Sequence, residues 1–191
     1  MRIALIRHLP TNWNKNGYLQ GKRDIPVSFP FSDQLKAEIE KNCRQLAKWA
    51  PFDAVFASSL MRTQQTANAY GYDSFMIERD LDELNFGRYE GKPKMKLLQD
   101  YGNQWIEQPL VLEFEESLVD FQQRIFSFLH RYNHLDKILV FGHGSWIRGL
   151  MSIATSGDIN QMNTIVLRNN ELIMLSILER LIRTKKQSVS N

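Results

Sequence analysis

The chain has 191 residues, of which 43% are hydrophobic and 24% are charged, and its formal net charge is +3. This composition excludes a disordered protein, and the length suits a single domain over 1–191. No apolar run approaches the length of a membrane span, and the start MRIALIRH lacks the pattern of a signal peptide, so we expect a cytoplasmic protein.

The first predicted element is a strand over 3–6, where Ile-Ala-Leu-Ile forms a short apolar run typical of a buried strand in a parallel sheet. The run ends at two polar side chains, Arg7 and His8, and the amide of Asn14 follows. Taken alone, an arginine and a histidine after a strand most often lie on the surface without a catalytic role. The meaning of this pair therefore depends on the rest of the chain.

A helix is predicted to follow, with Ser32 as its N-cap. Its apolar residues share one face at helical spacing: Leu35, Ile39, Cys43 and Leu46. Because Cys43 is the only cysteine, the chain cannot form an internal disulfide. Its place in this apolar stripe indicates a core residue rather than a catalytic thiol.

A second strand is predicted over 54–57, and the segment SSLMRTQQTA after it places Arg62 in the first turn of a helix. The segment LDELNFGRYEG then offers two adjacent carboxylates, Asp82 and Glu83. The stretch over 87–116 has two prolines and a weak helical signal, so we expect an inserted, lid-like segment rather than a separate domain. Four of its residues could contact a leaving group, although packing or exposure explains each equally well: Lys94, Met95, Tyr101 and Trp105.

A helix opened by Ser117, a third strand over 138–141 and a helix over about 147–154 continue the alternation of strands and helices. The third strand leads into FGHGSWIR, which places His143 at a junction between a strand and a helix. Near the C-terminus, NTIVL and ELIMLSI flank Asn169-Asn170 and predict a strand pair around a turn. The whole pattern predicts an α/β fold of three layers, α/β/α, with a mostly parallel central sheet.

Ligands of an open α/β sheet bind outside the carboxyl ends of the strands, so the loops after the three predicted strands should meet at one edge. That edge would carry two arginines and two histidines: Arg7, His8, Arg62 and His143. Arginine side chains and helix N-termini match the oxygens of a phosphoryl group, and a carboxylate can give a proton to an alcohol leaving group. The sequence therefore predicts a phosphoryl site, with one of the two adjacent carboxylates, Asp82 or Glu83, as the acid.

Five segments resemble motifs of the histidine phosphatase superfamily, also called the phosphoglycerate mutase-like family, and they occur in that family's order: RHLPTNWN, LQGKRDIPVS, SSLMRTQQTA, LDELNFGRYEG and FGHGSWIR. The segment ELNFGRYEG and the short chain resemble most the branch of alpha-ribazole and broad-specificity phosphatases. Three positions depart from the motifs: Leu9 replaces a glycine, no proline follows Ser59, and Glu116 stands where glycine is common. None removes a reacting group, but each bears on the shape of the pocket.

The resemblance implies a phosphoglycerate mutase-like fold and a phosphomonoesterase of the histidine acid phosphatase type that needs no metal and no cofactor. It makes His8 the nucleophile that forms a phosphohistidine, kept neutral by the charges of Arg7 and Arg62. Glu83 would protonate the leaving group and then activate water. Further side chains and a backbone amide would hold the phosphoryl oxygens: Arg7, Arg62, His143, Asn14, Gln20 and Gly144.

Two other functions stay open at this point: a phosphoglycerate mutase and a catalytically inactive phosphate-binding protein. Mutases of the family have a longer segment between the acid and the second histidine, and an inactive protein would not need His8, Glu83 and His143. The expected substrate is a small phosphorylated metabolite, such as alpha-ribazole 5′-phosphate or a sugar phosphate. Neither nucleic acid nor a membrane is an expected partner, and the sequence leaves the oligomeric state open.

Two features outside these motifs have ordinary interpretations. His130 and His134 have the spacing of two ligands on one helix face, but they lack a nearby cysteine or a His-Glu pair, so we expect a solvated helix end and no metal site. The basic end RLIRTKKQSVSN could meet an acidic partner, and a frayed, solvated terminus is the simpler interpretation.

Overall fold

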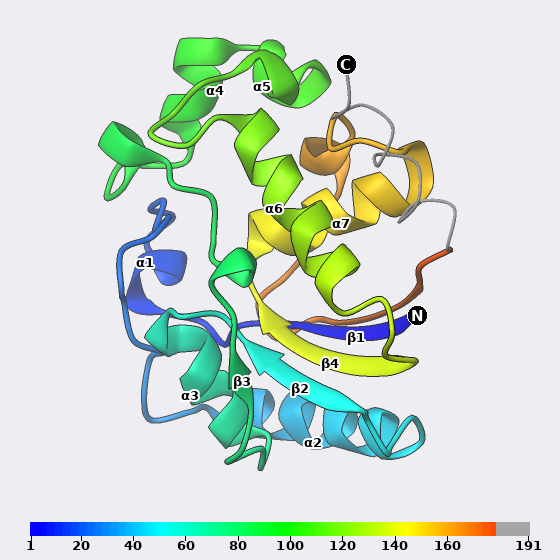
Figure 1. Cartoon of the computed structure of the whole chain (residues 1–191). Helices are drawn as coiled ribbons and strands as arrows, with labels where there is room; N and C mark the ends of the chain where they lie inside the picture. The colour runs from blue at the N-terminus through cyan, green and yellow to red at the C-terminus, as the bar shows by residue number, and fades with distance from the viewer. Residues whose placement is uncertain (179–191) are drawn as a thin grey trace.

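The computed structural model describes residues 1–178, and in them five strands form one sheet in the order β3-β2-β4-β1-β5 (Figure 1). The strands are β1 (Arg2–Arg7), β2 (Ala54–Ala57), β3 (Met76–Ile77), β4 (Lys137–Gly142) and β5 (Leu172–Ser176). All neighbours pair in parallel except β1 and β5, which are antiparallel. The predicted α/β fold with a mostly parallel sheet is confirmed.

Helices cover both faces of the sheet, with α2 and α3 on one face and α6 and α7 on the other (Figure 1). The helices are α1 (Asn12–Lys15), α2 (Asp33–Ala47), α3 (Met61–Ala69), α4 (Met95–Tyr101), α5 (Gln104–Glu107), α6 (Leu118–Arg131) and α7 (Gly144–Ser156). Side chains of β1 alternate between the two cores: Ile3 and Leu5 join the core that contains residues of α6 and α7, and Ala4 and Ile6 join the core that contains residues of α2. Each face of the sheet is thus sealed by its own apolar layer.

The predicted helix starts are present. Ser32 Oγ accepts a hydrogen bond from the backbone N–H of Leu35 at the start of α2, at 3.2 Å. Ser117 Oγ accepts one from Asp120 at the start of α6, at 3.0 Å. Each bond satisfies a backbone donor that the first turn of a helix leaves free. Cys43 lies partly buried against the core beneath α2, as its position in the apolar stripe predicted.

One predicted strand is wrong. The segment ELIMLSI contains β5, but NTIVL over 163–167 is not a strand: it begins in a short 3-10 turn and continues as a loop. The predicted strand pair does not form, and β5 pairs with β1 instead. The apolar run of 163–167 packs only in part, since Leu167 is buried while Val166 is 84% exposed.

The segment over 87–116 contains α4, α5 and two short 3-10 turns. Its aromatic side chains pack with Phe86 into one cluster with neighbouring ring centroids 5.4 to 6.2 Å apart: Phe86, Tyr89, Tyr101, Trp105 and Phe114. Contacts of this kind add stability beyond the apolar area they bury. The cluster therefore joins residues from both ends and the middle of the segment.

Three further sequence features remain to be compared with the structure. Within residues 1–178, none of the helices combines the length and the apolar composition that crossing a bilayer requires. His130 lies in the last turn of α6, whereas His134 lies beyond its end, so the two do not share one helix face. The basic end over 180–191 falls outside the described residues.

Candidate active site

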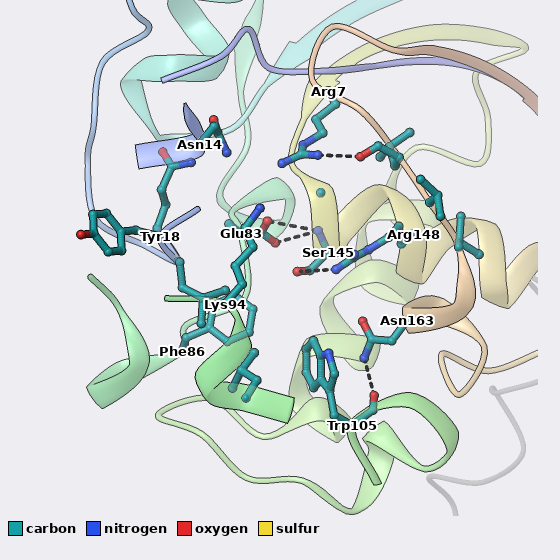
Figure 2. Close-up of a pocket in the computed structure, with 18 of the residues that line it drawn as sticks. Arg7, Asn14, Tyr18, Glu83, Phe86, Lys94, Trp105, Ser145, Arg148 and Asn163 are labelled. Atoms are coloured by element: carbon teal, nitrogen blue, oxygen red, sulfur yellow. Dashed lines mark hydrogen bonds between the residues drawn. The ribbon is translucent and has the colours of Figure 1, made fainter. Parts of the chain in front are cut away.

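A cavity of about 420 Å³ opens where β1 and β4 end, and its walls come from the loop after β1, the start of α7, α4 and the loop over 163–167 (Figure 2). Seven of the eight residues that the sequence assigned to the site line it: Arg7, His8, Asn14, Gln20, Arg62, Glu83 and Gly144. The eighth, His143, lies directly behind this wall. The structure thus brings together residues from four separate parts of the chain.

His8 is 2% exposed, and its Nδ1 lies 2.8 Å from the carbonyl oxygen of Leu9. A carbonyl only accepts, so Nδ1 carries the proton and Nε2 keeps its lone pair. Burial, followed by the charges of Arg62 and Arg7, holds the pKa of His8 well below 6.5. The sequence named the two arginines as the cause of a neutral ring, but desolvation contributes more.

Arg7 extends from the end of β1 over the start of α7. Its Nη1 donates to the carbonyl oxygen of Leu167 at 2.6 Å, while its buried Nε has no partner among the described residues. A Cβ at Gly144 would lie 3.3 Å from that Nε, so the absence of a side chain there lets the guanidinium lie against the helix. Burial and the nearby charge of Arg148 lower the pKa of Arg7 to about 10, which leaves it charged at neutral pH.

Arg62 is fully buried and connects three parts of the site. Its Nη1 and Nη2 donate to the carbonyl oxygens of Arg23 and Gly21 at 2.8 and 2.7 Å, and its Nε donates to Nδ1 of His143 at 3.2 Å. Gly21 has φ +53°, and a Cβ there would lie 1.9 Å from Oε1 of Glu90, so this carbonyl can be presented only from a glycine.

His143 has both ring nitrogens occupied by protein groups. Because Arg62 donates to Nδ1, Nε2 carries the proton and donates to Ser58 Oγ at 2.7 Å. The ring is fully buried, and its centroid lies 5.4 Å from that of His8. The resemblance predicted that His143 contacts a phosphoryl oxygen directly. In the structure His143 is not among the residues that line the cavity, and its ring accepts a hydrogen bond from Arg62.

The two candidate acids have different surroundings. Both carboxylate oxygens of Glu83 accept from the backbone N–H of Ser145, at 3.2 and 3.1 Å, and the side chain lines the cavity (Figure 2). Asp82 accepts from the backbone N–H and the hydroxyl of Ser59, at 2.9 and 2.8 Å, and does not line the cavity. Geometry therefore favours Glu83 over Asp82 as the acid.

Asn14 and Gln20 reach the cavity through a network centred on Thr11. Asn14 Oδ1 accepts from the backbone N–H of Thr11, and Gln20 Oε1 accepts from its hydroxyl, at 3.1 and 3.0 Å. With their oxygens engaged by donors, the two amides can turn their NH₂ groups toward an anion. Asn169 Nδ2 donates to the carbonyl oxygen of His8 at 2.9 Å and steadies the same loop.

The replacement of the family glycine by Leu9 does not reach the cavity. Leu9 is fully buried in the core that contains residues of α2, and its backbone N–H donates to Thr66 Oγ1 at 2.9 Å. Within residues 1–178, no three His, Cys, Asp or Glu side chains lie together as a metal-binding group.

Comparison with known proteins agrees with this geometry. The family model of the histidine phosphatase superfamily (branch 1) matches residues 3–188. The chain belongs to this superfamily. It is similar to phosphoserine phosphatase 1 of Hydrogenobacter thermophilus, with 26% identity over 172 residues that cover 84% of this chain and 79% of the relative.

Two further proteins show how far the similarity extends. The alpha-ribazole phosphatase of Shigella flexneri has a solved structure with a TM-score of 0.72 and 25% identity, covering 94% of this chain and 92% of that one. The 2,3-bisphosphoglycerate-dependent phosphoglycerate mutase of Bifidobacterium longum is 30% identical over 111 residues, which cover 54% of this chain and 43% of the mutase. This histidine phosphatase thus matches the alpha-ribazole phosphatase over nearly its whole length and the mutase over about half.

Among the cavity residues that received no role from the sequence are three with polar side chains on α7 or in the segment after it: Ser145, Arg148 and Asn163. Ser145 and Arg148 stand three apart in the motif GHGSWIRG, and that helical spacing could have placed Arg148 on the same face as Ser145. Of the residues considered for leaving-group contacts, Lys94, Met95 and Trp105 line the cavity, whereas Tyr101 does not and packs in the aromatic cluster.

Proposed function

We propose that this histidine phosphatase hydrolyses phosphomonoesters of small metabolites through a phosphohistidine at His8. The observation that carries the proposal is one cavity in which a neutral His8, with its tautomer set by Leu9, lies with the half-buried Arg7, the buried Arg62 and the carboxylate of Glu83. Alpha-ribazole 5′-phosphate and sugar phosphates are candidate substrates, supported by the name of the Shigella relative.

In the first step, Nε2 of His8 attacks phosphorus in line with the leaving oxygen. The P–N bond forms as the P–O bond breaks, and protonated Glu83 gives its proton to the departing alkoxide. Arg7 and Arg62 stabilise the negative charge that spreads over the three non-bridging oxygens. Asn14 and Gln20 add amide donors, and the backbone N–H of Gly144, at the start of α7, adds another.

In the second step, water attacks the phosphohistidine. Glu83 takes a proton from this water, the P–N bond breaks, and His8 returns to its neutral state as inorganic phosphate forms. The backbone N–H of Ser145 keeps the Glu83 carboxylate in place for both proton transfers. His143 acts in this scheme as a positioning residue, because its contact with Arg62 fixes the angle at which that guanidinium meets the phosphoryl group.

The groups named here supply the positive field that the reaction needs, so we propose that it runs without a metal ion. The leaving group would occupy the part of the cavity lined by Lys94, Met95 and Trp105.

A parallel assay of phosphate release and of 2- to 3-phosphoglycerate interconversion on one enzyme sample tests the proposal. We expect net release of inorganic phosphate with little interconversion. Only the segment over 87–116, about thirty residues, is available to cover the site, so water should reach the phosphohistidine. Interconversion well ahead of hydrolysis would replace hydrolysis by a mutase reaction. Binding of phosphorylated ligands without any turnover would indicate an inactive phosphate-binding protein.

A further inference from the structure

We infer that the cavity holds a second anion site, formed by Arg148 and Lys94, which binds a carboxylate on the leaving group of the substrate. The inference rests on the proposed hydrolysis and narrows its substrates to phosphomonoesters of small hydroxy acids. It favours such acids over alpha-ribazole 5′-phosphate and neutral sugar phosphates.

Arg148 is a charged residue whose hydrogen-bonding capacity is largely unused. It lies on α7, and its Nη2 makes only a long contact of 3.4 Å to Ser145 Oγ. Its Nε is buried and has no partner among residues 1–178, and no carboxylate forms a salt bridge with it there. Native proteins rarely leave a buried guanidinium donor unpaired, so Arg148 is suited to an anionic ligand.

Arg148 and Lys94 both lie near the acid Glu83. Arg148 contacts Ser145, whose backbone N–H holds the carboxylate that would protonate the leaving oxygen. In the view of Figure 2, Arg7 lies above the pair Glu83 and Ser145, while the side chain of Lys94 rises toward Glu83 from the lid-like segment. A carboxylate attached to the alcohol that Glu83 protonates would therefore lie in the part of the cavity that Arg148 and Lys94 line.

The charges of the lining favour a second anionic group on the substrate. Four cationic side chains line the cavity, Arg7, Arg62, Lys94 and Arg148, together with the acid Glu83. A phosphomonoester dianion balances only two of the four positive charges, and a carboxylate is the smallest group that adds a further negative charge. The proximity of the cations is visible in the pKa of Lys94, which partial burial of its ammonium group and then the charges of Arg7 and Arg148 lower, although the residue as a whole is exposed at the rim of the cavity.

Two substrates with the same carbon skeleton isolate the carboxylate: 3-phosphoglycerate and glycerol 3-phosphate differ only in carrying a carboxylate or a hydroxymethyl group. We expect wild-type enzyme to have a kcat/KM at least about tenfold higher for 3-phosphoglycerate, the size of one charge-assisted hydrogen bond. Arg148→Met should remove most of this preference, and Lys94→Met should remove less because Lys94 is exposed at the rim. Arg148→Lys, which keeps the charge, should retain part of it.

Arg44→Met is the matched control, since Arg44 is an exposed arginine of α2 outside the cavity lining. It should keep the wild-type ratio of the two kcat/KM values. Circular dichroism and thermal unfolding would show whether Arg148→Met is folded, and Arg148→Lys provides a second route if it is not.

The outcomes separate this inference from the proposed hydrolysis. If wild type hydrolyses glycerol 3-phosphate as well as 3-phosphoglycerate, the carboxylate site is wrong while the phosphatase activity stands. If Arg148→Met slows both substrates by the same factor, Arg148 serves the phosphoryl group and the inference is also wrong. If wild type hydrolyses neither these two nor p-nitrophenyl phosphate, the proposed hydrolysis itself fails.

Discussion

Replacing Arg124 of α6 by methionine should destabilise the fold and displace the candidate acid together. The Arg124 guanidinium donates to the carbonyl oxygens of Asp80, Asp82 and Glu83 at 2.9, 2.7 and 3.1 Å. It also forms a bidentate pair with Glu116 at 2.6 and 3.0 Å. One side chain thus fixes the loop that carries Glu83 and satisfies the carboxylate that replaces a glycine of the family motif.

The size of the expected loss of stability follows from the burial of the Arg124 and Glu116 side chains. The side chains of Arg124 and Glu116 are only 14% and 13% exposed, so removing the arginine leaves a largely buried carboxylate without its cation. Breaking such a pair from one side costs about 3–5 kcal/mol, and the midpoint of thermal unfolding should fall by about 6–20 °C. Where the protein is still folded, a Glu83 shifted by an ångström should lower kcat for an alkyl phosphate by up to about 100-fold.

Arg44→Met, on α2, is the control with an exposed ion pair. Arg44 pairs with Glu40 at 3.8 Å and the two side chains are 70% and 72% exposed, so its loss strands no buried carboxylate and should cost no more than about 1 kcal/mol. Urea unfolding of both variants gives the comparison, and Arg124→Met/Glu116→Met should recover part of the loss because no charge is stranded. Equal costs for the two single variants, or full activity in Arg124→Met, would refute this reasoning.

Three shorter predictions concern the chemistry and the titration of the site. Glu83→Gln should slow hydrolysis of glycerol 3-phosphate by about 100-fold or more and that of p-nitrophenyl phosphate far less, since a phenolate leaves without a proton; an equal loss on both substrates would argue against Glu83 as the acid. Because burial holds the pKa of His8 and of His143 well below 6.5, the unfolded chain binds protons first as the pH falls, so the free energy of unfolding should decrease below pH 6.5. The slope is at most about 1.4 kcal/mol per pH unit for each histidine, and a free energy in urea unfolding that rises toward pH 5 would contradict two neutral rings. Activity should survive exhaustive treatment with EDTA, and a loss that zinc or magnesium restores would contradict the proposed absence of a metal.

The sequence predicted β1, β2, β4 and β5 because each is a continuous apolar run, but it missed β3, which has only two residues. It also predicted a strand at NTIVL, whose apolar run instead forms part of the wall of the cavity. Which segment pairs with an edge depends on contacts between distant residues, and local pattern does not contain that information. The aromatic cluster of the segment over 87–116 also depends on contacts between residues that are distant in the sequence, so local pattern does not predict it.

The site was predictable in composition and less so in arrangement. Arg7 ends β1, His8 follows it and Arg62 lies in the first turn of the helix after β2, so the sheet topology brings these three together. Glu83 comes from a loop, and its place in the cavity depends on tertiary contacts. The occupation of both ring nitrogens of His143 depends on Ser58 and Arg62, and no spacing in the sequence indicates it. The neutral state of His8 owes most to desolvation, which the packed structure has to supply.

The most direct test of the account is whether phosphate from a substrate becomes bound to His8. Wild-type enzyme mixed with a phosphomonoester labelled in its phosphoryl group and quenched rapidly in alkali should carry the label on His8, identified by peptide mass spectrometry. His8→Ala should remain unlabelled, while His130→Ala, which alters a histidine at the end of α6, should be labelled like wild type. Full labelling of His8→Ala, or label found on another residue of the wild-type enzyme, would contradict the proposed phosphohistidine mechanism.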